Sequence, residues 1–422
     1  MQSNNRARTK RRPDMMTLLP REGILAGALA IIGISGIGGC ASYHPLPLSN
    51  HAQLVRRIDD VRHTLPAQTA GAEPEVIDIS KPLNADQVGL LTILNDPELR
   101  AERGEFDRAQ ADLTQSKVLP NPSVSLGYAA LLGGSATTDA LSASLTQDVK
   151  SLLTYRRRVA SARARVSEVN AELLWREWQV AQKARLLAVD LYWGRLSIVS
   201  GEAALASIAE TASRVGTEVD RGDMSQSALA PLLASKVGLE QSVSSLHLAQ
   251  LKNWQDLDAL LGMTPDARFA IAQPGMPSIS TDLEAQINEL PERRPDLIAL
   301  RLGYRSADED VRAAILGQFP TLVLGGSWNS DTSDVRSGGP TVTFDLPIFD
   351  RNQGQVAKTR ATRRLLYEQY QNRLDQVDAT ILGLQARSER IAASLATARD
   401  DAASADSQLE RVHQAYDQGT LD

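Results

Sequence analysis

Few residue patterns in this 422-residue chain point to catalysis or metal binding. No Gly-x-Ser-x-Gly, His-Glu-x-x-His or phosphate-loop motif occurs. The acidic run Asp308-Glu309-Asp310 is interpreted as a solvated helix face, because consecutive helical residues point in different directions. We therefore expect no catalytic residue, no metal, no cofactor and no enzymatic activity. The five histidines do not have the spacing of metal ligands: His44, His51, His63, His247 and His413.

Cys40 is the one residue placed for covalent chemistry. It follows a basic leader and an apolar run over 24–37, which is short for a membrane span and typical of a signal peptide. Ile37-Gly38-Gly39-Cys40 resembles a bacterial lipobox, which predicts a lipoprotein signal peptide over 1–39 and acyl chains, palmitate among them, on Cys40. By the same resemblance, Ala41 in place of aspartate favours the outer membrane. A plain signal peptide with an incidental cysteine is the alternative.

The composition indicates a folded, helix-rich chain. Hydrophobic residues make up 42% and charged residues 23%, which argues against general disorder. Aromatic residues are only 4%, which favours long helices packed through small side chains. The formal net charge of −6 argues against nucleic-acid binding. A single cysteine excludes an intrachain disulfide.

The chain contains an internal duplication. Asp96-Pro97-Glu98-Leu99 matches Arg294-Pro295-Asp296-Leu297, and the segment beginning at Pro122 matches the one beginning at Pro320, both 198 residues apart. Leu145–Val149 matches Val342–Leu346 at an offset of 197. One register with a single-residue slip predicts two copies of one unit, each a helix, two strands and a long helix.

Four segments alternate in polarity as membrane-spanning or half-buried strands do. We expect strands over about 122–132, 140–150, 320–329 and 340–349, with loops at Gly133-Gly134 and Gly338-Gly339. A soluble sheet with one polar face would show the same alternation. Four strands cannot close a barrel and open edges are not tolerated in lipid, so membrane-spanning strands would require several copies of the chain.

Two stretches free of proline predict very long helices. Residues 155–218 and 353–416 carry apolar residues every seven positions, as in a coiled coil, and 226–261 reads as a return helix that stops at Gly262. We expect this organisation: signal peptide 1–39, extended lead-in 40–92, first repeat 93–264 with its first helix at about 95–118, linker or belt 265–292, and second repeat 293–422 with its first helix at about 293–317.

From about residue 85 onward the chain resembles the TolC-like outer membrane efflux family. Glu292-Arg293-Arg294-Pro295-Asp296-Leu297 is similar to the family's run before its second repeat, and Phe319-Pro320-Thr321 and Leu119-Pro120-Asn121-Pro122 to its strand-entry signatures. Tyr416-Asp417-Gln418-Gly419 is similar to the turn at the periplasmic helix tip.

The resemblance implies a mainly α protein with a transmembrane β part. Three copies would form a 12-stranded β-barrel in the outer membrane, continued by a periplasmic α-helical barrel. It implies passive export of small solutes with two partners, a periplasmic adaptor protein and an inner-membrane pump of RND type. Adaptor contacts are expected at the helix tips: Arg214, Arg221, Gly222, Gln418 and Gly419. Pore-lining residues are expected on the polar strand faces: Ser142, Ser144, Thr146, Asp148, Thr341, Thr343 and Asp345.

Two expectations depart from a complete channel subunit. The second copy has no counterpart of 226–261 before Asp422, which reads as a truncated chain and predicts that a product of this length does not form stable trimers. The rival function is a soluble periplasmic coiled-coil scaffold or adaptor. Adaptors, however, have one helical hairpin flanked by lipoyl-like and barrel motifs, not a duplicated hairpin with alternating strands.

Overall fold

The computed structural model describes residues 42–65, 76–134, 138–275 and 283–418. The chain divides into two units, 1–53 and 54–422. In the first unit, the described residues 42–53 are exposed and have no helix or strand. The predicted signal peptide, the predicted lipidation site Cys40 and the tip residue Gly419 lie outside the described residues.

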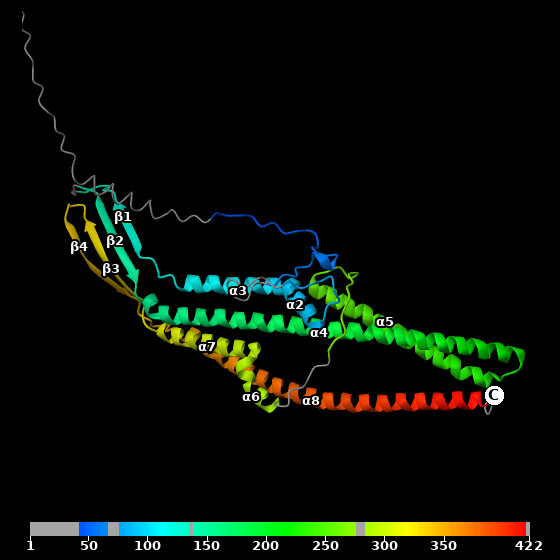
Figure 1. The fold of residues 1–422 in the computed structure, drawn as a ribbon. Coiled ribbons are helices and arrows are strands. Elements are labelled where there is room, and N and C mark those ends of the chain that lie inside the picture. Colours follow the sequence, from blue (N-terminus) through cyan, green and yellow to red (C-terminus); the bar gives the residue numbers. More distant parts are fainter. Residues whose placement is uncertain (1–41, 66–75, 135–137, 276–282, 419–422) are drawn as a thin grey trace, which may run out of the picture. The chain divides into compact units, whose positions relative to one another are not determined.

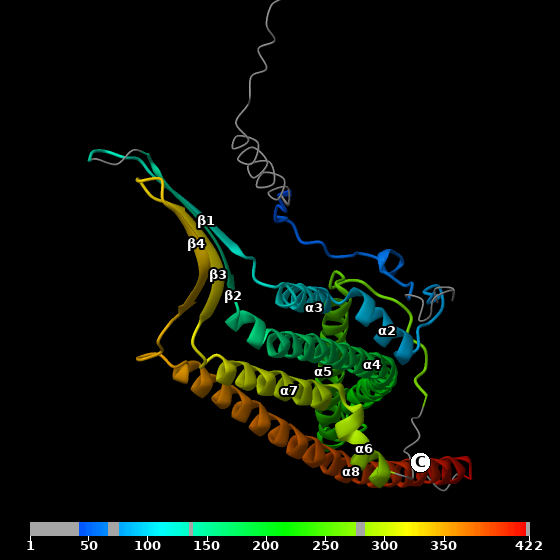
Figure 2. The same ribbon diagram turned by 90° about the vertical axis from the view of Figure 1, so that its left-hand side faces the viewer.

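The second unit contains long helices at one end and a four-stranded sheet at the other (Figure 1). The two longest helices are α4 (Lys150–Arg221), with 72 residues, and α8 (Gln353–Asp417), with 65. Helix α7 lies between them and contacts both (Figure 2). The remaining helices are η1 (Ile58–Asp60), α2 (Ala85–Asn95), α3 (Pro97–Ser116), α5 (Gln226–Leu261), α6 (Leu283–Arg293) and α7 (Pro295–Leu316).

Two helices lie in segments that were predicted to be extended or linking: α2 in the lead-in and α6 in the linker. The lead-in was expected to be extended through residue 92, but α2 starts at Ala85. Its start is fixed by a capping box, in which Asn84 Oδ1 accepts from Gln87 N at 2.9 Å and Gln87 Oε1 accepts from Asn84 N at 3.0 Å. The linker after residue 265 likewise ends in α6.

The sheet is antiparallel with the strand order β1-β2-β3-β4. Its strands are β1 (Ser123–Ala129), β2 (Ala140–Asp148), β3 (Leu322–Ser330) and β4 (Arg336–Phe344). The glycines expected in the second loop, Gly338 and Gly339, instead lie inside β4, where they pair with Trp328 and Ser327. The tighter turn at 331–335 is held by Asp331, whose Oδ1 accepts from Ser333 N at 2.8 Å and Val335 N at 2.9 Å.

Helix α4 packs mainly through small residues. The buried face of α4 includes Ala164, Ala171, Ala181, Ala184 and Ala188, whereas Leu187 is the only buried member of its predicted heptad series. Alanine lets two helix backbones approach closely, so the alanine face of α4 carries the close contacts and the larger heptad residues lie at its margin. In α8 the predicted seam is buried at Val377 and exposed from Leu384 onward.

The main apolar core lies where α2, α4 and α5 meet the lead-in. It includes Leu83, Leu91, Leu191 and Leu257, all less than 3% exposed. Isolated parallel β-bridges join Val55 to Met263 and Leu83 to Ile271, so the lead-in pairs with the segment that follows α5. None of the described helices has the length and apolar character needed to cross a membrane.

Candidate functional site

The sheet has one strongly apolar face that the rest of the described chain leaves uncovered. Residues paired across strands share a face, and the row of Val124, Leu145 and Pro340 is apolar, as is the row of Leu126 and Trp328. Leu126 is 72% exposed, Leu145 54% and Val342 60%. A surface this apolar and this exposed marks a contact with lipid or with another protein.

The opposite face is polar and made of small side chains. Ser125, Ser144 and Ser327 are directly paired in one row, and Thr146, Gly325 and Thr341 in the next. A side chain at Gly325 would place its Cβ 2.4 Å from Leu145 O and 2.8 Å from Thr146 Cγ2. Atoms therefore crowd on this face, as they do on the inside of a curved sheet, and the curvature is visible in Figure 2.

The structure brings six of the seven predicted pore-lining residues together on this polar face. Asp345 follows the end of β4, and its N–H donates to Thr321 O at 3.2 Å. Asp148 also has a local structural role, because its carboxylate accepts from Lys150 N at 2.9 Å and Ser151 Oγ at 2.8 Å at the start of α4. The six residues on the face are Ser142, Ser144, Thr146, Asp148, Thr341 and Thr343.

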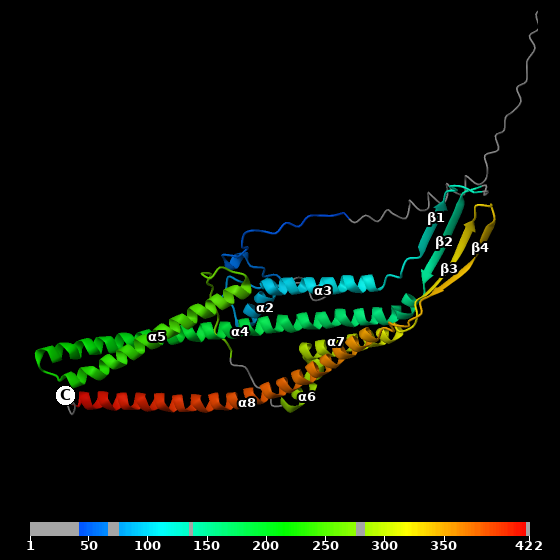
Figure 3. The same ribbon diagram turned by 180° about the vertical axis from the view of Figure 1, so that it is seen from behind.

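The predicted helix tips lie at the C-terminal ends of α4 and α8, at the end of these helices that is farthest from the sheet (Figure 3). Gly222 caps α4 with a φ of +87°, and its N–H donates to Val219 O at 3.0 Å. Arg214 pairs with Glu210, and Arg221 pairs with Glu218 at 3.1 Å. Gln418 N donates to Gln414 O at 3.1 Å. The described tip residues thus make local contacts, and their role in adaptor binding stays a prediction.

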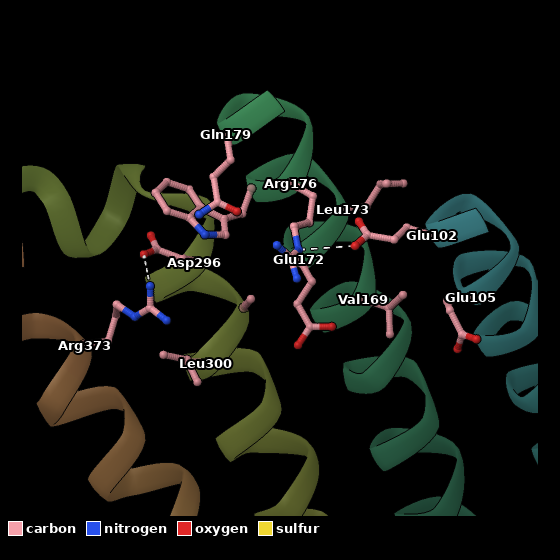
Figure 4. A pocket seen from close by; sticks show the side chains of 12 residues that line it. Glu102, Glu105, Val169, Glu172, Leu173, Arg176, Gln179, Asp296, Leu300 and Arg373 are labelled. Carbon is pink, nitrogen blue, oxygen red and sulfur yellow. Dashed lines mark ion pairs between the residues drawn. The ribbon is translucent and has the colours of Figure 1, made fainter. Parts of the chain in front are cut away.

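A pocket of about 520 Å³ lies between α3, α4, α7 and α8 (Figure 4). The Asp296 carboxylate is 5% exposed and accepts two hydrogen bonds from Arg294, at 3.0 and 2.7 Å. Arg373 of α8 lies 3.6 Å from the same carboxylate. The Arg294 guanidinium also lies 4.7 Å from the ring centre of Trp175 on α4.

This network gives the Arg-Pro-Asp run a structural role that the sequence analysis missed. Pro295 occupies the first turn of α7, and the two charged residues beside it tie that turn to α4 and α8. On the other wall, Arg176 pairs with Glu102 at 3.2 Å, yet burial raises the pKa of Glu102 above its ordinary value. The pocket therefore carries ion pairs that join residues of different helices.

A second buried carboxylate was not anticipated from the sequence. Asp258 lies near the end of α5 and is 1% exposed, with Oδ2 3.2 Å from Arg268 Nη1. Its Oδ1 has no hydrogen-bond partner. Burial, only partly offset by Arg268, raises the pKa of Asp258 to about 6. An aspartate within the apolar run Leu257–Leu261 was the available sequence signal.

Within the described ranges, no three histidine, cysteine, aspartate or glutamate side chains are grouped so that they could hold a metal ion. The buried carboxylates described above are engaged by arginines. The most distinctive arrangement in the described chain is the sheet, which has polar side chains on one face and apolar side chains on the other.

Residues 286–421 match a family model described as outer membrane efflux protein. The outer membrane protein OprJ of Pseudomonas aeruginosa is 26% identical over 172 residues, which cover 38% of this chain and 36% of OprJ. The chain therefore aligns with about a third of the length of that relative.

Solved structures share the fold over a larger span. A membrane protein from Pseudomonas aeruginosa superposes with a TM-score of 0.66 at 16% identity, over 90% of this chain and 91% of that chain. The channel protein CusC gives a TM-score of 0.61 at 16% identity, over 80% and 83% respectively. The predicted fold class is confirmed: the chain has the fold of TolC-like channels, with long helices attached to a four-stranded sheet.

Proposed function

We propose that the chain is an exit-duct subunit in the outer membrane, because its residues 286–421 match a family model described as outer membrane efflux protein. In this role it gives small solutes a passive, water-filled path from the periplasm to the exterior. The observation that carries the proposal is the two-faced sheet. Its apolar face would contact lipid, and its polar face, with Ser144 and Thr341, would contact water in the lumen.

Closure of the duct requires more than one copy. The sheet has two edge strands, β1 and β4, and within the described chain neither has a second partner. Open edges are excluded from the hydrocarbon core, and membrane barrels need at least about eight strands. Three copies with β1 of one beside β4 of the next supply twelve strands, so the proposed assembly is a homotrimer.

The helical part would continue the duct into the periplasm. At about 1.5 Å per residue, the 72 residues of α4 extend roughly 110 Å. The tip at Gly222 would contact a periplasmic adaptor, and an RND-type inner-membrane pump would supply the energy. Acyl chains on Cys40 would anchor the chain to the same membrane. These assignments draw on the family and on the predicted lipobox.

The soluble scaffold is the weaker candidate. A soluble sheet would have to keep residues such as Leu126, Tyr128 and Phe344 in water, and each of these is more than half exposed. An apolar patch of this kind lowers solubility and promotes association. Lipid on that face removes the difficulty and also accounts for the polar residues on the other face.

Conductance measurements test the proposal. Protein expressed from its own gene and added to planar phospholipid bilayers is expected to conduct ions. A bulky, charged thiol reagent should reduce the conductance of Ser144→Cys, whose side chain faces the lumen, and should leave Leu145→Cys unchanged. Membrane-bound protein that conducts no ions, or equal block of both variants, would contradict a duct lined by the polar face.

A further inference from the structure

The end of the sheet that meets the helices carries an excess of basic residues. Four exposed arginines lie within the first twelve residues of their helices, Arg156 and Arg158 on α4 and Arg360 and Arg364 on α8. We call these four residues the junction collar. None of them has an ion-pair partner within the described part of the chain, although Glu368 and Asp310 line hollows beside them.

Three arginines near the collar, Arg157, Arg312 and Arg363, form ion pairs with acidic residues of α7. Arg157 lies 3.1 Å from Glu309, and Arg363 lies 2.7 Å from Asp308. Arg312 contacts both of these carboxylates, at 2.7 and 2.8 Å. The two half-buried acidic residues of α7 are therefore already shared among three arginines. The collar arginines remain exposed, and none forms an ion pair with a described residue.

The collar lies beside exposed apolar side chains. Arg158 lines a hollow of about 400 Å³ together with Val118 and Leu119, which are 51% and 52% exposed. Arg360 and Arg364 line a second hollow of about 370 Å³ that also includes Tyr367. An arginine can lay its methylene stem on an apolar surface and extend its guanidinium toward phosphate, and tyrosine favours the same interface.

The depth of the collar fits a headgroup layer. Arg156 and Arg158 lie six and eight residues beyond the first residue of α4, and Arg360 and Arg364 lie seven and eleven beyond that of α8, which corresponds to about 9–17 Å along the helices. The interfacial layer on each side of a bilayer is about 5–8 Å thick, and helical side chains tilt toward the N-terminal end of the helix, so long side chains can extend from this depth back toward the layer. The opposite end of the sheet has a net negative charge, with Asp139, Asp331 and Asp334 against one arginine, Arg336, which lies 3.5 Å from Asp334. The charge therefore favours anionic lipid on the helical side only.

We propose that the junction collar binds the headgroups of acidic phospholipids in the leaflet on the helical side of the membrane. The guanidinium groups would contact lipid phosphates while the acyl chains continue along the apolar face of the sheet. This inference rests on the proposed membrane-spanning sheet. It adds a lipid preference and a fixed depth of insertion. Each basic residue near an anionic surface contributes about a fivefold change in affinity, so loss of four should exceed tenfold.

A matched pair of variants tests the collar. Arg156→Gln/Arg158→Gln/Arg360→Gln/Arg364→Gln removes it. The control removes four exposed arginines from the distal half of α8, Arg387→Gln/Arg390→Gln/Arg399→Gln/Arg411→Gln, so both variants lose the same charge. Each protein, expressed from its own gene, is purified in a neutral detergent and titrated with phosphatidylglycerol or phosphatidylcholine. Bound lipid is counted by native mass spectrometry.

The wild type and the control are expected to bind phosphatidylglycerol in preference to phosphatidylcholine, with a preference that falls as salt rises. The collar variant should lose that preference by at least tenfold. Equal lipid selectivity in all three proteins would overturn the collar. So would a collar variant whose assembly is weakened equally in both lipids, since the arginines would then contact protein. If the wild-type protein instead conducts no ions in the planar bilayers used above, the proposed duct fails, independently of the lipid preference measured in detergent.

Discussion

An arginine placed on either face of β2 distinguishes a lipid-facing sheet from a soluble one. Leu145→Arg places the charge on the apolar face, and Ser144→Arg places it one residue away on the polar face. Both positions lie in a central strand, so neither substitution disturbs an edge. Leu145 is 54% exposed, so its replacement removes little packing inside the chain.

The magnitude follows from the position of Leu145 in the membrane. Strand β2 has nine residues and would extend about 30 Å, with Leu145 one residue from its centre. The side chain would therefore lie near the bilayer midplane, where a lipid-facing arginine costs about 2–4 kcal/mol. This corresponds to a loss of about 30- to 1,000-fold in the equilibrium between inserted and unfolded chains.

Urea unfolding from phospholipid vesicles, followed by tryptophan fluorescence, measures this free energy. Leu145→Arg should lower the free energy of unfolding by about 2–4 kcal/mol. Ser144→Arg, facing water, should change it by about 0.5 kcal/mol or less. Equal and small effects of both substitutions would refute the lipid-facing assignment, because a soluble sheet tolerates a charge on either exposed face.

Three further predictions concern other parts of the chain. Gly325→Val should destabilise the protein by about 1–3 kcal/mol in the same unfolding assay, since its Cβ would meet a backbone oxygen at 2.4 Å. Gly326→Val, with nothing nearer than 3.9 Å, should cost less, and equal losses would contradict the crowding. Asp258 binds its proton more tightly in the folded chain, with a pKa of about 6 against an ordinary 3.8, so its contribution to stability is lost as the pH rises from about 4 to 6. Above pH 6, the free energy of unfolding of Asp258→Asn should therefore exceed that of the wild type by up to about 3 kcal/mol. A difference between the two proteins that does not shrink below pH 4 would contradict this. Gly222→Trp should abolish crosslinking to the adaptor while Gly238→Trp, in open space on α5, retains it, and unchanged crosslinking of Gly222→Trp would remove the tip from the adaptor interface.

Much of the fold could be predicted because strand and helix periodicities were strong. The alternation of apolar and polar residues in Leu141–Val149 predicted which side chains share a face. The pairing of β2 with β1 and β3 agrees, because it places Ser142, Ser144 and Thr146 on the same face. The return helix begins at Gln226 and ends at Leu261 as expected, because a glycine with φ of +64° follows it.

Other features were missed because their signals were non-local or were given the wrong meaning. The pair Gly338-Gly339 predicts a loop by composition, yet glycine also fits a strand in which a Cβ added at Gly338 would lie 3.2 Å from Ser327 O. Helix α2 was overlooked although Asn84 and Gln87 have capping-box spacing. The contact of Arg294 with Trp175 joins residues more than a hundred positions apart, and no local pattern predicts it.

The central claim is that the two faces of one sheet meet different solvents. Single cysteines placed in turn at residues 141–148, in protein expressed from its own gene and held in native membranes, test it most directly. We expect a membrane-impermeant thiol reagent to label the even positions, and spin-labelled lipid to quench fluorophores at the odd positions. Wild-type protein, whose one cysteine is Cys40, gives the background labelling that is subtracted from each variant. Uniform labelling at all eight positions, with no quenching by lipid, would contradict the account.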